Sequence, residues 1–152
     1  CHVCLLRPKS TGEVTLNSNN AFDSPKIDPK FFSEREDMDI MIKGYRKMMQ
    51  IMDAEPLRPF TRKVQDPVDI NSEADIEAAM RARADTVYHP VGTCKMGSDE
   101  MSVVNHELKV HALENVRVVD ASIMPTLVGG NTNAPTIMIG EKAADMIKQA
   151  WS

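Results

Sequence analysis

Residues 116–136 decide how the chain folds, and they include Val116-Arg117-Val118-Val119-Asp120 followed by Gly129-Gly130-Asn131-Thr132-Asn133. The first run is apolar and rich in β-branched residues up to its Asp, which predicts a strand. The two glycines predict a flexible turn, and the polar residues with Pro135 that follow predict the start of a helix that continues to Trp151. Such a helix start presents free backbone N–H groups and the positive end of the helix dipole. We therefore expect an electron-rich group to lie in front of this turn.

The helix expected over residues 137–151 has one apolar face, which predicts that it packs with this face inward. The face consists of Ile137, Gly140, Ala144, Ile147 and Trp151. Four polar side chains surround the helix start, at positions 131, 132, 133 and 136, which is more than one N-cap requires. A capped helix after a glycine-rich turn explains this pattern as well as a binding site does.

The composition is that of an ordinary globular domain, with 152 residues, 42% of them apolar, and a formal net charge of -4 at pH 7. The sequence has no apolar run approaching the ~20 residues of a membrane span and no basic-then-apolar leader. Its mild acidity argues against nucleic acid as the main partner. Cys1, Cys4 and Cys94 are an odd number without repeated spacing, which favours a reducing compartment over a disulfide framework.

The N-terminal region predicts a β-hairpin and a loop. The chain begins at Cys1 without Met and already inside an apolar run, so we expect it to be a piece of a longer protein. Residues 3–7 and 13–18 flank a turn that contains Pro8 and Gly12, which is typical of a hairpin with one solvent-facing side. Residues 19–32 are rich in Asn, Asp, Ser and Pro and predict a loop.

Two helices are expected before residue 86, joined by proline-containing residues 54–71. A capping-box sequence at Ser33 and an apolar stripe predict the first helix over residues 34–53. The stripe consists of Met38, Met41, Ile42, Tyr45, Met48, Met49 and Met52. It is either an adaptable binding surface or a plain core stripe, and the core interpretation is favoured. Ser72 opens the second helix, which ends near Asp85 and turns Ile76, Ala79, Met80 and either Arg83 or Ala84 inward.

His89 lies in an apolar, strand-like stretch over residues 86–97. Because Pro90 disfavours helical backbone at the preceding residue, this imidazole is expected in extended backbone, although a lone His beside apolar residues is usually structural. The His89–Cys94 and His106–His111 spacings match no metal-binding pattern, so no metal is expected. A Cys94–His89 nucleophile pair would have to form through space, and nothing local marks a reactive thiol. The sequence contains no G-x-G-x-x-G motif and no P-loop, so this chain alone has no visible phosphate cradle.

Three motifs carry a resemblance to a known family. They are His89-Pro90-Val91-Gly92-Thr93-Cys94-Lys95-Met96-Gly97, Val118-Val119-Asp120-Ala121-Ser122-Ile123-Met124-Pro125 and Gly130-Asn131-Thr132-Asn133-Ala134-Pro135-Thr136. With them the chain resembles, over nearly its whole length, the C-terminal part of the glucose-methanol-choline (GMC) flavoprotein oxidoreductases, most closely the bacterial choline dehydrogenase-like members. It departs at Val103-Val104-Asn105-His106, where members often carry Asp-Pro after the two valines, and there we expect only a local turn to change.

The resemblance implies an FAD-dependent enzyme that oxidises a primary alcohol by passing a hydride from its carbinol carbon to the flavin. The first motif's histidine faces the flavin and the substrate hydroxyl in that family, and a His or Asn is the second catalytic residue; here these are His89 and Asn131. The residues expected to bind the cofactor are Asp120, Ala121, Asn131, Thr132, Asn133, Pro135 and Thr136. The residue chemistry agrees, because imidazole accepts a proton near neutral pH and a carboxamide orients a hydroxyl without titrating.

The resemblance also implies an α+β fold with a mixed or antiparallel sheet and flanking helices. Residues 1–111 would be a portion of the substrate (cap) domain, and residues 112–152 the last strand and helix of the FAD-binding domain. The family's N-terminal FAD-binding half is missing, so this chain alone is expected to be inactive and to bind no FAD.

The expected partners are an alcohol substrate, the missing FAD-binding half and an electron acceptor, either a quinone or oxygen. The expected location is the cytoplasm, or a membrane surface for the full-length protein. Two other functions stay open. One is a lyase on the same scaffold in which His89 only moves protons, and the other is a non-enzymatic interaction module that uses the methionine-rich helix.

Overall fold

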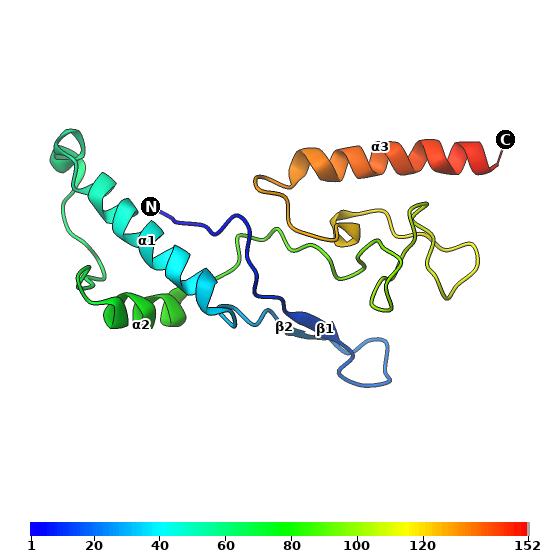
Figure 1. Cartoon of the computed structure of the whole chain (residues 1–152), viewed down its shortest axis with the longest axis horizontal. Helices are drawn as coiled ribbons and strands as arrows, with labels where there is room; N and C mark the ends of the chain where they lie inside the picture. Colours follow the sequence, from blue (N-terminus) through cyan, green and yellow to red (C-terminus); the bar gives the residue numbers. More distant parts are fainter. Residues whose placement is uncertain (152) are drawn as a thin grey trace. The chain divides into compact units, whose positions relative to one another are not determined.

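The computed structural model describes residues 1–151 and consists of two compact units, Cys1–Asp85 and Thr86–Ser152. Figure 1 shows the three α-helices, labelled α1 to α3, and the short strands β1 and β2. The secondary structure is mixed, since helices accompany one two-stranded sheet among the described residues. Within residues 1–151, no helix has both the length and the apolar character needed to cross a membrane.

The first unit is built on two helices, α1 (Arg35–Met52) and α2 (Glu73–Arg83), whose apolar faces pack together. The buried core consists of Met38, Ile42, Ile76 and Met80. A 3-10 helix, η1 (Glu55–Phe60), lies in the linker that was expected to be irregular. Both expected helices are confirmed to within two residues of their ends. The first part of the expected stripe, Met38 to Tyr45, belongs to this core, whereas Met48, Met49 and Met52 are half-buried outside it.

The start of α1 differs from the capping box expected at Ser33. The N-cap residue is Glu34, and no side chain caps α1. The backbone N–H of Glu34 instead donates to the Ser10 hydroxyl at 3.1 Å. The buried carboxylate of Asp37 accepts the backbone N–H groups of Lys9 and Ser10 at 2.9 and 2.7 Å. A segment 24 to 28 residues away in sequence therefore contacts the start of α1, where a local capping box was expected.

The hairpin is present, but its strands are not the expected ones. β1 (Glu13–Thr15) pairs antiparallel with β2 (Lys26–Asp28), whereas residues 3–7 form no strand. The backbone N–H groups of residues 9 and 10, which lie between residues 3–7 and β1, donate to Asp37 of α1. β2 lies in the segment that was expected to be a loop. Gly12 allows the close approach before β1, because a Cβ there would lie 2.6 Å from the Pro29 backbone.

The second unit has little regular structure before its helix. The expected strand over residues 116–119 makes a single bridge, Lys109 to Arg117, and then leads into the 3-10 helix η2 (Ala121–Ile123). The strand-like stretch over residues 86–97 makes one bridge as well, from Met96 to Val104. Both strand predictions are therefore wrong, because each stretch forms an isolated bridge and not a strand. Leu108 adopts a left-handed φ of 63°, so the partner segment bends before a ladder can extend.

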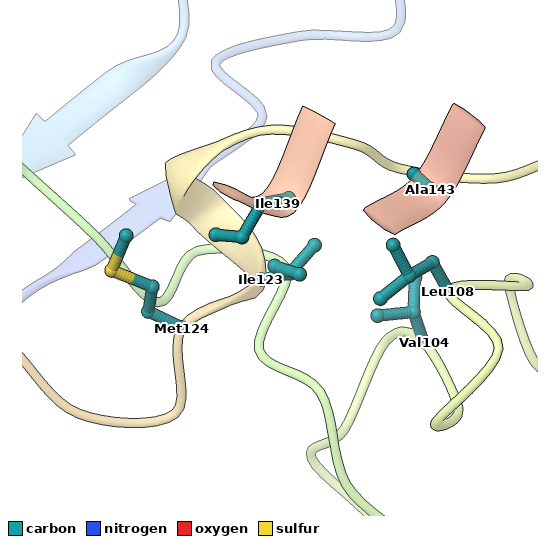
Figure 2. Packing of buried hydrophobic residues seen from close by; sticks show 6 residues of the cluster. All are labelled: Val104, Leu108, Ile123, Met124, Ile139 and Ala143. Carbon is teal, nitrogen blue, oxygen red and sulfur yellow. The ribbon is translucent and has the colours of Figure 1, made fainter. Parts of the chain in front are cut away.

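The helix α3 (Asn133–Ala150) is confirmed, but it buries a different face from the one expected. Ile139 and Ala143 are buried, whereas Ile137 and Trp151 are 58% and 82% exposed. Figure 2 shows the buried pair pointing into a cluster with Val104, Leu108, Ile123 and Met124. Because α3 has apolar residues on more than one side, its periodicity alone does not choose the buried side. Residues 86–111 and 112–151 share this core, so they pack as one unit.

Candidate active site

A pocket of about 260 Å³ lies in the second unit where three stretches far apart in sequence meet. These are the stretch that precedes Val91, the helix η2 and the start of α3. The lining residues are Tyr88, His89, Pro90, Ala121, Thr132, Asn133 and Thr136. The pocket therefore contains both the histidine of the first sequence motif and the helix start of the third.

Hydrogen bonds on both sides of His89 fix the path of its backbone. Tyr88 has a left-handed φ of 63°, and its N–H donates to the Thr86 hydroxyl at 2.9 Å. After the motif's Gly92, which has a φ of 86°, the N–H of Cys94 donates to the Ser122 carbonyl at 3.1 Å. The stretch that carries His89 is thus tied to η2.

The imidazole of His89 contacts the N-cap residue of α3. Its Nδ1 lies 3.0 Å from Oγ1 of Thr132, a residue that is only 6% exposed. These two residues are 43 positions apart in the sequence. Either atom can donate in this pair, because a neutral imidazole carries one hydrogen on either nitrogen and a hydroxyl both donates and accepts.

The first turn of α3, which begins beside the pocket, leaves two backbone donors without a partner in the helix. No side-chain hydrogen bond caps this helix, although its N-cap residue is the threonine Thr132. The Thr132 carbonyl accepts from both the N–H and the hydroxyl of Thr136, at 3.0 and 2.7 Å. Pro135 has no N–H, so Asn133 and Ala134 carry the first-turn donors that lack a partner within the helix. The positive end of the dipole and these donors together favour an electron-rich ligand.

The turn before η2 is held by Asp120. Its carboxylate accepts the backbone N–H of Ser122 at 2.7 Å, so it caps η2. Ala121, the next residue, lines the pocket.

The structure brings together five of the residues expected at the site, namely His89, Ala121, Thr132, Asn133 and Thr136. Asn131, Asp120 and Pro135 are not among the residues that line the pocket, and Asn131 is exposed. The sequence analysis missed Tyr88 and Pro90 as lining residues, although both are direct neighbours of His89. The roles of all these residues remain predictions.

A larger hollow of about 400 Å³ lies elsewhere in the second unit and contains none of the motif residues. It is lined by Asn105, Lys109, Val110, His111, Leu113, Glu114, Asn115 and Arg117. Its charged lining residues are Lys109, Arg117 and Glu114, and the His111 ring lies 3.0 Å from the Gly97 carbonyl. Its size alone does not make it the site, because it offers no convergent set of reactive groups.

Neither a metal centre nor a thiol site emerges within residues 1–151. No group of three or more His, Cys, Asp or Glu side chains in the described chain is placed to hold a metal ion. Cys1 and Cys4 are exposed, and Cys94 is half-buried outside the His89 pocket. The Cys94–His89 pair considered from the sequence therefore gains no support from the pocket.

Comparison with known proteins identifies close relatives. Residues 8–140 match the family described as GMC oxidoreductase. The chain is 51% identical over 147 residues to an alcohol dehydrogenase (acceptor) of Pseudomonas putida, a match that covers 96% of this chain and 27% of that protein. It is 47% identical over 150 residues to the mitochondrial choline dehydrogenase of Mus musculus, with 97% and 25% covered.

Among solved structures, a formate oxidase of Aspergillus oryzae matches with a TM-score of 0.90 at 33% identity. That match covers 96% of this chain and 26% of the oxidase chain. The chain thus spans about a quarter of the length of the relatives it matches.

Proposed function

Because the chain belongs to the GMC oxidoreductase family, whose members are FAD-dependent, we propose that it carries the catalytic base of an alcohol dehydrogenase. In this proposal His89 takes the proton of the substrate hydroxyl while a hydride leaves the carbinol carbon. The observation that carries it is the position of His89, which Thr132 holds in the pocket at the start of α3.

Proton removal by His89 makes hydride loss easier, because the negative charge that develops on oxygen pushes electrons toward the carbinol carbon. Imidazole suits this task, since it takes up a proton near neutral pH. The chemistry that FAD supplies when bound is acceptance of the hydride. The hydroxyl proton would therefore go to this chain and the carbinol hydrogen, as hydride, to the cofactor, so that the alcohol leaves as a carbonyl compound.

The residues at the start of α3 fit the edge of an electron-rich ring. Open N–H groups at Asn133 and Ala134 and the positive helix end would stabilise negative charge that develops there. Asn131 immediately precedes this turn, and in the proposal its carboxamide orients the substrate oxygen. Asp120 holds the turn that places Ala121 beside the same pocket.

The substrate class we propose is a small primary alcohol, with choline as one candidate. Support comes from the names of two relatives, an alcohol dehydrogenase and a choline dehydrogenase.

We further propose that residues 1–111 belong to the substrate domain and residues 112–152 to the FAD-binding domain of a longer flavoprotein. The phosphate-binding loop would then come from that longer protein, since this sequence contains none.

The base can be tested in the full-length flavoprotein by mixing it anaerobically with an alcohol and following the loss of flavin colour. His89→Gln should slow this reduction by about 10² to 10⁴, the usual contribution of a general base. His106→Gln is the matched control, because His106 is an exposed histidine of the same unit outside the pocket. Reduction of the His89→Gln enzyme at the rate of the unaltered enzyme would falsify the proposal.

The same experiment separates the oxidoreductase from a lyase on this scaffold. A lyase would convert its substrate without any loss of flavin colour. Repeating the measurement with choline, simple primary alcohols and aromatic alcohols identifies the substrate class, because the rate constant of reduction reports each alcohol separately.

A further inference from the structure

We propose that the hydroxyl of Thr132 positions the catalytic imidazole by accepting a hydrogen bond from Nδ1–H of His89, which leaves Nε2 as the nitrogen that takes the substrate proton. This inference rests on the proposed function, in which His89 is the base. It assigns Thr132 a role as a positioning residue that acts through His89.

The first support is that the Thr132 hydroxyl is not used by its own helix. A threonine at an N-cap normally has extended backbone and accepts a hydrogen bond from the second or third helical N–H. Thr132 instead has φ and ψ of -85° and -6°, and its side chain caps nothing in α3. Its hydroxyl lies 3.0 Å from His89 Nδ1. The Thr132 hydroxyl therefore contacts the imidazole ring and not the backbone of its own helix.

The second support is that Thr132, which carries the hydroxyl, has little freedom to move. Thr132 is 6% exposed, and a β-branched side chain has restricted freedom at χ1. Its carbonyl is tied to Thr136 through both the backbone N–H and the hydroxyl of that residue, at 3.0 and 2.7 Å. A fixed hydroxyl of this kind sets the orientation of the imidazole plane as well as occupying one ring nitrogen.

The direction of the hydrogen bond follows from what a base requires. If Nδ1 carries the hydrogen, Nε2 keeps its lone pair, and the bond from Nδ1–H to the hydroxyl persists when Nε2 accepts the proton. That bond also becomes charge-assisted in the imidazolium, so Thr132 stabilises the protonated ring. In the opposite tautomer Nε2 already carries a hydrogen and cannot accept another. Thr132 is thus suited to favour the reactive tautomer, as the third member of a catalytic triad does.

The rate test compares Thr132→Val, which keeps the shape but removes the hydroxyl, with Thr132→Ser, which keeps the hydroxyl. In the full-length flavoprotein, Thr132→Val should slow anaerobic flavin reduction at saturating alcohol by about three- to tenfold, the worth of one hydrogen bond. The KM for the alcohol should stay unchanged, because the contact acts on proton transfer. Thr132→Ser should recover the rate, and Thr126→Val, the same change in an exposed loop, should leave it unaltered.

A second measurement does not depend on turnover. In full-length protein labelled with ¹⁵N-histidine, the His89 signal is assigned by its loss in His89→Gln. The ring should carry hydrogen on Nδ1 and none on Nε2 in the neutral form, and this preference should weaken in Thr132→Val but not in Thr132→Ser.

Either of two outcomes overturns the inference. One is a neutral His89 that carries hydrogen on Nε2 in the unaltered protein, and the other is an unchanged rate and tautomer in Thr132→Val. If Thr132→Val does not fold, the tautomer in the unaltered protein and the Thr132→Ser result still decide. Failure of the proposed function is recognised separately, because it appears as full activity in His89→Gln whatever the tautomer.

Discussion

At the scale of single residues, Asp99 shows how one carboxylate organises a turn in the second unit. It accepts hydrogen bonds from the Ser102 hydroxyl at 2.7 Å and from the Met101 N–H at 3.0 Å, and Lys95 Nζ lies 2.9 Å from it. These contacts favour the charged form, with the Ser102 hydrogen bond first and that of Lys95 next, and they lower the pKa of Asp99 to about 2.

The Asp99 turn gives a prediction at this scale. The carboxyl signal of Asp99, followed by ¹³C NMR, should titrate with a pKa of about 2. Ser102→Ala should raise this pKa further than Lys95→Met, because the Ser102 hydrogen bond is the larger cause. Since the folded-state pKa lies below the ordinary value of 3.8, the carboxylate supports the turn above that pH and loses this effect as the pH falls toward 2. A titration midpoint at the ordinary value would contradict the described hydrogen bonds.

At the scale of elements, a buried carboxylate on α1 binds the backbone of a segment far away in the sequence. Asp37 is 2% exposed and accepts the N–H groups of Lys9 and Ser10. Burial is the largest influence on the pKa of Asp37 and raises it, but the hydrogen bonds from Ser10 and Lys9 together outweigh burial and leave the pKa below its usual value. The charge on Asp37 therefore stabilises the first unit above about pH 4, and this contribution is lost as the pH falls through the lowered pKa.

The prediction for this element concerns stability. Asp37→Ala in the full-length protein should lower the free energy of unfolding of the first unit by about 1.5–3 kcal/mol, because two backbone donors lose a charged acceptor. Asp39→Ala is the matched control on the same helix, since Asp39 is exposed and contacts Arg35 one turn away. Its loss should cost less than about 0.5 kcal/mol. The protection of the Lys9 and Ser10 amides against hydrogen exchange is compared in the two variants. Equal protection in both would rule out the assigned role of Asp37.

At the scale of the whole molecule, the chain exposes more surface than compact proteins of its mass. The exposed area is 11664 Å². Two separate compact proteins that share its 16.9 kDa would together expose about 9,300 Å². Large apolar side chains contribute to this excess, among them Phe22 at 97% and Trp151 at 82% exposed. Ile137 of α3 is exposed as well, at 58%.

The corresponding prediction is that the 152-residue chain, expressed alone, binds no FAD and oxidises no alcohol. It should also bind a hydrophobic dye such as ANS through its exposed apolar side chains, whereas the full-length flavoprotein should bind much less per mole. Absorbance of dialysed protein after incubation with FAD measures cofactor binding. Tight, stoichiometric yellow colour on the isolated chain would show that this part of the prediction is wrong.

The three helices and the family resemblance could be predicted from the sequence alone. Helical periodicity, the Ser72 cap and the motif residues are all encoded within a few neighbouring positions, so they can be recognised locally.

The contacts between segments far apart in the sequence could not be predicted in this way. In the fold, the Ser10 hydroxyl accepts the N–H of the α1 N-cap residue, and β1 pairs with β2. In α3, Ile139 is buried and Ile137 is exposed. The Thr132 hydroxyl also lies within hydrogen-bond distance of the His89 ring, although the two residues are 43 positions apart. The physical reason is that hydrogen-bond donors and apolar faces are satisfied by whichever segment arrives beside them in the fold, and local sequence carries no record of that segment.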